Sequence, residues 1–167
     1  MTVTVRNEQR DAPVNVARMA RLARRSVRRL RIWARGTLAI TFIDARRMRA
    51  LNRRFLRHDR TTDVLSFRYD GEPIVGDIVI SPSAAQRYAR RHGVSYTEEL
   101  SRYVVHGLLH WLGHEDRTLV QQRKMRAMEG LLLVRCGMNR SGRAGKWDTS
   151  IFAVGKTRAK IEMSRRV

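Results

Sequence analysis

Three of the five histidines lie within nine residues of the chain, in segment 106–116, which reads HGLLHWLGHED. On a helix, residues four apart lie on the same side, so His106 and His110 are expected to present their imidazoles together. Two imidazole nitrogens can share one zinc ion at roughly 2.0–2.1 Å each. Gly113 permits a sharp turn, which brings a third ligand, three residues farther on, back toward the same ion. This pattern predicts a catalytic zinc site whose fourth position is left to water.

The simpler alternative for any one histidine on a buried helix is a hydrogen-bonded core residue. That alternative is weaker for His106 and His110, because two imidazoles among leucines and valines need partners for their polar atoms. A metal ion supplies such a partner, so the paired spacing favours metal binding.

The helix that carries these histidines is expected to begin at residues 95–98, which form a capping-box pattern, and to run to Gly113. Its residues are apolar on nearly every face, which indicates a central and buried helix. Thr118 and Gln121 form a second capping-box pattern, which predicts a last helix from there to about residue 135.

The rest of the chain predicts one α+β domain. A one-faced helix is expected over residues 14–33, a buried strand over 37–43, and a short helix from Asp44 to about residue 56. Two strands at residues 64–69 and 74–81 are joined by a hairpin signal, and a helix with Ser81 at its N-cap follows. Residues 1–12 are expected to be mobile or an edge strand. We therefore expect a small mixed β-sheet packed with about five helices over residues 1–137. A flexible basic tail is expected over residues 138–167.

Composition limits the possible partners. The chain has 167 residues, of which 35 are basic and 15 acidic, and its formal charge is +20. A charge of this size favours a polyanion as partner. The preference for arginine over lysine suits phosphate contacts, and a codon bias that inflates arginine on a solvated surface is the alternative explanation for it. The single cysteine fits a reducing compartment, and no apolar run is long enough to span a bilayer, so we expect a cytoplasmic protein that binds no membrane.

The histidine segment resembles the signature of the YbeY family of rRNA maturation factors, His-Gly-x-Leu-His-x-x-Gly-x-x-His. Residues 51–55 (LNRRF) and 59–67 (DRTTDVLSF) are similar to the second block of that family, and residues 76–81 (GDIVIS) are similar to its third. The order and spacing of the three blocks match, and the resemblance covers roughly residues 14–136.

The resemblance implies a zinc-dependent endoribonuclease that cleaves single-stranded RNA, with one zinc ion per chain. It also implies a role in maturation of the small-subunit rRNA 3′ end and in ribosome quality control. The ribosomal small subunit and an assembly GTPase are the partners that it implies.

This chain departs from the family pattern at two positions. The third ligand is usually histidine, whereas Asp116 stands here, and a carboxylate oxygen is an acceptable zinc ligand. His114 is the alternative third ligand. The family often has an arginine directly after the aromatic residue of the second block, whereas this chain has Leu56 there, followed by Arg57.

The roles of the remaining site residues follow as expectations. Arg57 is the candidate phosphate clamp, and Glu115 or His58 is the candidate proton carrier. Arg46, Arg53, Arg54 and Arg57 are candidate RNA contacts. The arginines of the first helix are expected to form an electrostatic track together with Arg46, Arg47, Arg49, Arg53 and Arg54 of the second helix. A merely solvated basic face is the alternative.

Two other functions fit parts of the pattern. A metzincin-like zinc peptidase shares the histidine spacing, but in that class a glutamate general base follows the first histidine, and Gly107 stands here. A non-catalytic RNA-binding assembly factor with a structural zinc is the second alternative, and His114 would then complete four protein ligands. The sequence leaves open whether the nucleophile is a water molecule or the RNA 2′-hydroxyl.

Overall fold

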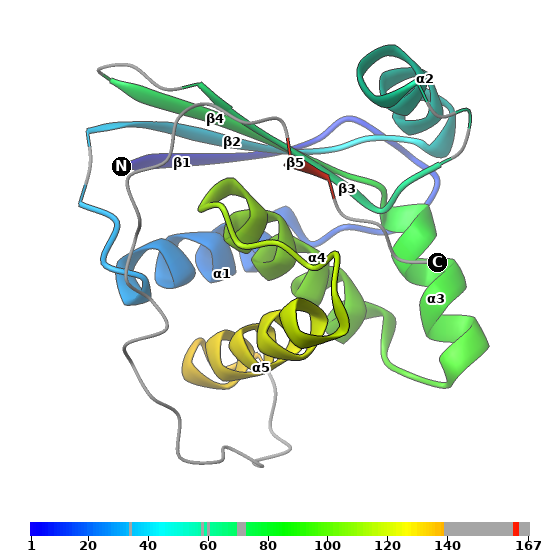
Figure 1. The fold of residues 1–167 in the computed structure, drawn as a ribbon. Helices are drawn as coiled ribbons and strands as arrows, with labels where there is room; N and C mark the ends of the chain where they lie inside the picture. The colour runs from blue at the N-terminus through cyan, green and yellow to red at the C-terminus, as the bar shows by residue number, and fades with distance from the viewer. Residues whose placement is uncertain (34, 58, 60, 70–72, 139–161, 164–167) are drawn as a thin grey trace.

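The computed structural model describes residues 1–33, 35–57, 59, 61–69, 73–138 and 162–163. Over these residues it forms a mixed β-sheet with helices on both of its faces (Figure 1). The strands are β1 (Thr2–Asn7), β2 (Gly36–Phe42), β3 (Val64–Tyr69), β4 (Ile74–Ile80) and β5 (Glu162–Met163). The helices are α1 (Val16–Arg29), α2 (Ala45–Leu56), α3 (Pro82–His92), α4 (Tyr96–Trp111) and α5 (Leu119–Arg135). The predicted α+β class with a small mixed sheet is confirmed.

The strands of the sheet lie in the order β1-β2-β4-β3-β5. Strands β1, β2 and β4 are mutually parallel, whereas β3 runs antiparallel to β4 and the two-residue β5 runs antiparallel to β3. The predicted pair of antiparallel strands is confirmed, although the turn at residues 70–72 lies outside the described residues. Of the two alternatives for the N-terminal segment, the structure selects the edge strand.

Alternation along the strands gives the sheet two different faces. On one face, Ile40 and Ile78 belong to the large core cluster that also includes residues of α1, α4 and α5. On the other face, Leu65 and Phe67 pack against Met48 of α2 in a smaller cluster. Helix α2 therefore lies on the opposite side of the sheet from α1, α4 and α5 (Figure 1).

Two glycines leave room for helix α4 against the sheet. A Cβ atom on Gly107 would lie 2.6 Å from Ile78 Cγ2, and one on Gly76 of β4 would lie 2.1 Å from Trp111 Nε1. Ser66 of β3 also donates a hydrogen bond to the Gly107 carbonyl, at 3.0 Å. These contacts fix the rotation of α4, so they fix the direction in which its histidines point.

Most of the predicted helix ends are confirmed, with three corrections. Helix α1 spans Val16–Arg29 and therefore ends four residues before the predicted end at residue 33. Asp44 accepts a hydrogen bond from the Arg47 backbone N–H, and Thr118 and Gln121 form a complete capping box. Ser81 was expected to cap α3 with its side chain, but its hydroxyl hydrogen-bonds to the Ser83 hydroxyl instead. Helix α4 ends at Trp111, two residues before the predicted end.

The C-terminal segment is described only at residues 162–163. These two residues pair with β3 at Leu65 and Ser66. The rest of the expected tail, residues 139–161 and 164–167, lies outside the described residues, so its flexibility stays a prediction.

Candidate metal centre

His106, His110 and Asp116 form a buried cluster between α4 and the segment that leads into α5. Their candidate ligand atoms all lie within 4.8 Å of one another, and all three residues are buried. The Nε2 atoms of His106 and His110 lie 3.0 Å apart. The Asp116 carboxylate oxygens lie 3.7 Å from His106 Nε2 and 3.6 Å from His110 Nε2. The structure thus brings together the three residues that the sequence selected.

The chemistry of these atoms fits a shared cation. His106 Nδ1 faces the carboxylate of Glu129, so the ring proton of His106 is placed on Nδ1. His106 Nε2 then keeps a lone pair directed at His110 Nε2. Two facing imidazole nitrogens and a carboxylate, buried together, require a proton or a positive ion between them. Two histidine nitrogens and one carboxylate oxygen are also a donor set that zinc accepts in hydrolytic sites.

Glu129 of α5 holds His106 from behind. Its Oε1 lies 2.6 Å from His106 Nδ1, and both side chains are almost completely buried. A carboxylate on the far nitrogen of a ligating histidine fixes the tautomer and the ring orientation, and it makes the ligating nitrogen more basic. The Nδ1 of His110, by contrast, is buried without a hydrogen-bond partner among the described residues.

Sequence reasoning missed Glu129, although the sequence contains a signal for it. The buried positions of α5 follow a helical stripe, and Glu129 is the charged residue on that stripe, beside Met125, Met128 and Leu132. A carboxylate on an apolar stripe needs a buried partner. That signal could have identified Glu129 as a site residue, but it could not have said which histidine it meets.

His114 stands apart from the cluster in the structure. It is half-buried, and its backbone N–H donates to the Leu109 carbonyl as α4 ends. Burial lowers the pKa of His114, and the nearby Lys124 adds to that effect. Among the described residues, the cluster of candidate ligands contains Asp116 and not His114.

The other candidate site residues lie on different elements. Glu115 precedes Asp116, and its carboxylate lies 3.9 Å from the Arg117 guanidinium. Arg57 ends α2 in a left-handed conformation with φ 56° and is exposed, whereas His58 lies outside the described residues. No ion pair or hydrogen bond found in the described part of the chain joins Arg57 to the cluster.

The arginines of α2 differ in their surroundings. Arg53 and Arg54 are exposed, and the Arg54 guanidinium lies 5.5 Å from the Phe55 ring centre. Arg47 is paired with Glu8 at 3.0 Å, and Arg49 with Asp59 at 2.7 Å. Helices α1 and α2 lie on opposite faces of the sheet, so their arginines lie on two sides of it, and the electrostatic track along both helices stays a prediction.

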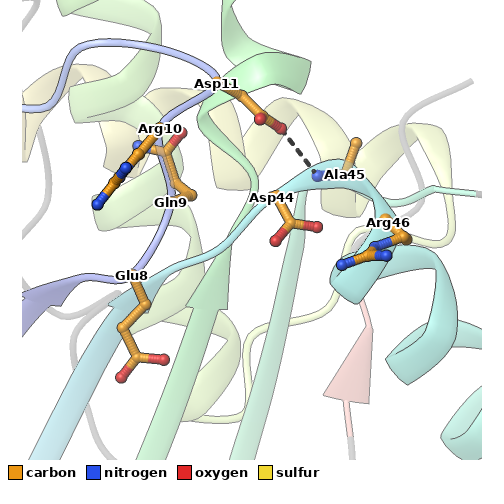
Figure 2. Close-up of a pocket in the computed structure, with 7 residues that line it drawn as sticks. All are labelled: Glu8, Gln9, Arg10, Asp11, Asp44, Ala45 and Arg46. Carbon is orange, nitrogen blue, oxygen red and sulfur yellow. Dashed lines mark hydrogen bonds between the residues drawn. The ribbon is translucent and has the colours of Figure 1, made fainter.

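Arg46 lies at a different place from the metal cluster. It lines a hollow of about 590 Å³ at the start of α2, together with residues of both charges (Figure 2). In this hollow the Asp11 carboxylate accepts a hydrogen bond from the Ala45 backbone N–H. None of the cluster residues lines it, so the hollow is no part of the candidate metal centre.

Comparison with known proteins identifies the family. A family model described as endoribonuclease YbeY matches residues 4–137. The chain belongs to the endoribonuclease YbeY family. The matched region contains every residue of the candidate metal centre, and it ends where the basic C-terminal segment begins.

Individual relatives agree with this membership. The chain is 34% identical over 163 residues to the endoribonuclease YbeY of Acidothermus cellulolyticus, covering 87% of this chain and 99% of that protein. It is 35% identical over 144 residues to that of Thermobifida fusca, covering 80% and 92%. A relative from Myxococcus xanthus is 39% identical over 108 residues, covering 60% of this chain and 37% of that protein.

A solved structure shows the same fold. The solution structure of a Thermotoga maritima protein matches with a TM-score of 0.58 and 21% identity, covering 87% of this chain and all of that one. In the described part of the chain, no helix is long and apolar enough to cross a membrane.

Proposed function

We propose that this protein is a zinc-dependent endoribonuclease that cleaves single-stranded RNA during maturation of the small-subunit rRNA 3′ end. The observation that carries the proposal is the buried group of His106, His110 and Asp116 in a chain of the endoribonuclease YbeY family. We extend the proposal to ribosome quality control, with the ribosomal small subunit and an assembly GTPase as partners. Such an RNA substrate would place the protein in the cytoplasm.

Each residue of the centre has a defined task in this proposal. His106, His110 and Asp116 hold one zinc ion, and Glu129 orients His106 through its Nδ1 proton. When bound, such an ion lowers the pKa of a coordinated water and polarises a phosphoryl oxygen. Glu115 or His58 carries the proton, and Arg57 neutralises the phosphate charge.

The environment of Gly107 argues against a peptidase. In a metzincin-like enzyme this position holds the glutamate that activates water. Here position 107 faces β3 and β4, where an added Cβ would lie 2.6 Å from Ile78 Cγ2 and 3.0 Å from Val64 Cγ1. A glutamate at this position could not reach the face that carries His106.

Cleavage of a labelled single-stranded RNA tests the proposal, with the protein as purified, after chelation, and after addition of one equivalent of zinc. We expect cleavage to be lost on chelation and restored by zinc. Asp116→Ala should lose zinc affinity by more than the 10–100-fold typical of an outer-shell change, and should lose cleavage. His114→Ala is the matched control, and it should keep both.

The outcomes separate the alternatives. If zinc-loaded protein leaves RNA intact, a non-catalytic assembly factor is favoured. If His114→Ala loses zinc and Asp116→Ala keeps it, His114 is the third ligand and Asp116 is not. The ends of the products decide the nucleophile, because a 2′,3′-cyclic phosphate arises only from attack by the RNA 2′-hydroxyl.

A further inference from the structure

The segment around α1 is the longest stretch of the chain that contains no acidic residue. Between Asp11 and Asp44 there are eight arginines and no acidic residue. Five of them lie on the outer side of α1 and are exposed: Arg21, Arg24, Arg25, Arg28 and Arg29. Their spacing of three, four, seven and eight residues keeps them on one side of the helix.

The inner side of α1 explains why the arginines face outward. Its buried residues pack into the large core cluster, with Met19, Leu22, Ala23 and Val27 at the contact. The Ser26 hydroxyl lies 3.7 Å from Cys136 Sγ, and Arg25 donates to the Cys136 carbonyl at 3.0 Å. Helix α1 is therefore fixed to the end of α5, and its arginine side cannot rotate inward.

Within the described residues, these arginines have no acidic partner of the kind that other arginines have. On α2, Arg47 and Arg49 are paired with Glu8 and Asp59. None of the ion pairs found among the described residues involves an arginine of α1. A row of unneutralised guanidinium groups attracts phosphates, which they can bind with two donors each.

Trp33 follows α1 in the chain and is a second, independent observation. Its side chain is 77% exposed, and Arg31 and Arg35, two positions away on either side, are also exposed. Ile32, by contrast, packs against the core. An exposed indole among arginines is the arrangement with which proteins stack an unpaired base while binding the adjoining phosphates.

We infer that the outer side of α1 and Trp33 form an RNA-anchoring surface that is separate from the candidate metal centre. The arginines bind the phosphate backbone without regard to sequence, and Trp33 stacks on an unpaired base. The inference rests on the proposed function for the choice of RNA over other polyanions.

Helix α1, which carries the anchoring surface, and the metal centre meet α5 at different places. Helix α1 packs against the edge strand β1 and against α4, and it meets α5 at Cys136. The metal centre meets α5 at Glu129, seven residues earlier, which is about 10 Å along a helix axis. A long RNA can occupy both places, whereas a short oligonucleotide can be cleaved without the anchor.

Binding of a labelled 30-nucleotide single-stranded RNA, measured across a range of salt concentrations, tests the anchor. The triple variant Arg21→Gln/Arg24→Gln/Arg28→Gln removes three exposed charges and leaves Arg25 in place. Each phosphate contact contributes about 0.7 to the slope of log affinity against log salt for a single strand, so the slope should fall by about 2. Affinity at about 0.1 M salt should fall at least ~10-fold.

The matched control removes the same charge elsewhere. Arg87→Gln/Arg90→Gln/Arg91→Gln changes three exposed arginines of α3 and should leave the slope within about 0.5 of the wild-type value. Equal losses in the two triple variants would overturn the inference, because net charge alone would then explain the binding. An unchanged slope in the α1 variant would overturn it as well.

Trp33 is tested by Trp33→Ala and Trp33→Phe in the same assay. Loss of one stacked base should weaken binding of the long RNA about 10-fold in the alanine variant, and phenylalanine should restore most of it. Equal affinity of all three proteins would remove Trp33 from the anchor. Binding to vesicles with about 30% phosphatidylserine is measured in parallel. If the protein binds these vesicles through the α1 arginines and Trp33 but does not bind RNA, the partner of this surface is a membrane and the inference is overturned.

Cleavage of a six-nucleotide RNA at saturating concentration separates this inference from the proposed function. The α1 and Trp33 variants should cleave it at the wild-type rate, since they change only the anchor. If no protein cleaves any RNA, the proposed function fails, while the binding arms still decide whether the anchor exists.

Discussion

Replacement of Glu129 is the sharpest test of how the candidate centre holds its metal. The Glu129 carboxylate meets His106 Nδ1 at 2.6 Å, from a helix that supplies no other residue to the cluster. Glu129→Gln keeps the size and an acceptor oxygen but removes the charge, whereas Glu129→Ala removes the acceptor altogether. The two variants therefore separate the effect of charge from that of the hydrogen bond.

The expected magnitudes follow from the geometry of this contact. A charge-assisted hydrogen bond is about twice as strong as a neutral one, and outer-shell partners typically contribute 10–100-fold to metal affinity. We expect Glu129→Gln to weaken zinc binding about 10-fold, or about 1.4 kcal/mol, and Glu129→Ala about 100-fold. The alanine variant should also lose about 1–3 kcal/mol of unfolding free energy, because it leaves the buried His106 N–H without an acceptor.

Zinc affinity is measured by competition with a fluorescent chelator, and stability by chemical denaturation of the metal-free proteins. Glu98→Gln is the matched control, because it makes the same chemical change at an exposed position of the first turn of α4. It should leave zinc affinity unchanged. Wild-type zinc affinity in both Glu129 variants would refute the orienting role, and an equal loss in Glu98→Gln would assign the effect to net charge.

Three further predictions concern stability. Gly107→Ala should lower the unfolding free energy by about 1–3 kcal/mol in denaturant titrations, because its Cβ would press on the sheet at 2.6 Å. Thr118→Ala should cost about 1 kcal/mol in the same titration, because it removes one half of the capping box of α5. Burial raises the pKa of the Cys136 thiol, so the unfolded chain ionises before the folded one as pH rises. The contribution of the protonated Cys136 thiol to the free energy of unfolding is complete below the pKa of an exposed thiol. It is lost as pH rises through the folded-state pKa. The fall in unfolding free energy between about pH 8 and pH 10 should therefore be smaller in Cys136→Ala than in wild type.

The helices and strands could be predicted because their signals are local. Apolar periodicity marks α1, and the Thr118 capping box marks the start of α5, since each depends only on residues within one or two turns. Ser81 shows the limit of such reasoning. A serine before a proline is a good N-cap signal, but the Ser81 hydroxyl bonds to the Ser83 hydroxyl and caps no backbone N–H.

The metal cluster could be found from sequence only where its residues are close in the chain. His106 and His110 are related by the helical repeat, and Asp116 lies one turn beyond Gly113. Glu129 depends instead on how α5 packs against α4, which no local pattern specifies. The division of the arginines into two surfaces depends on the sheet that lies between α1 and α2, so it too required the fold.

The direction in which α4 presents its histidines is set by the residues on its opposite side. Gly107 and Trp111 fit against β4 because one lacks a side chain and the other lies over Gly76. Any larger residue at position 107 would push α4 away from the sheet and move His106 relative to Glu129. The same glycine that removes the peptidase general base therefore also sets the depth at which the imidazoles are held. The histidine spacing alone fits either a zinc peptidase or a zinc-dependent ribonuclease. Position 107 packs against the sheet, so this packing fits only an enzyme that takes no catalytic residue from position 107.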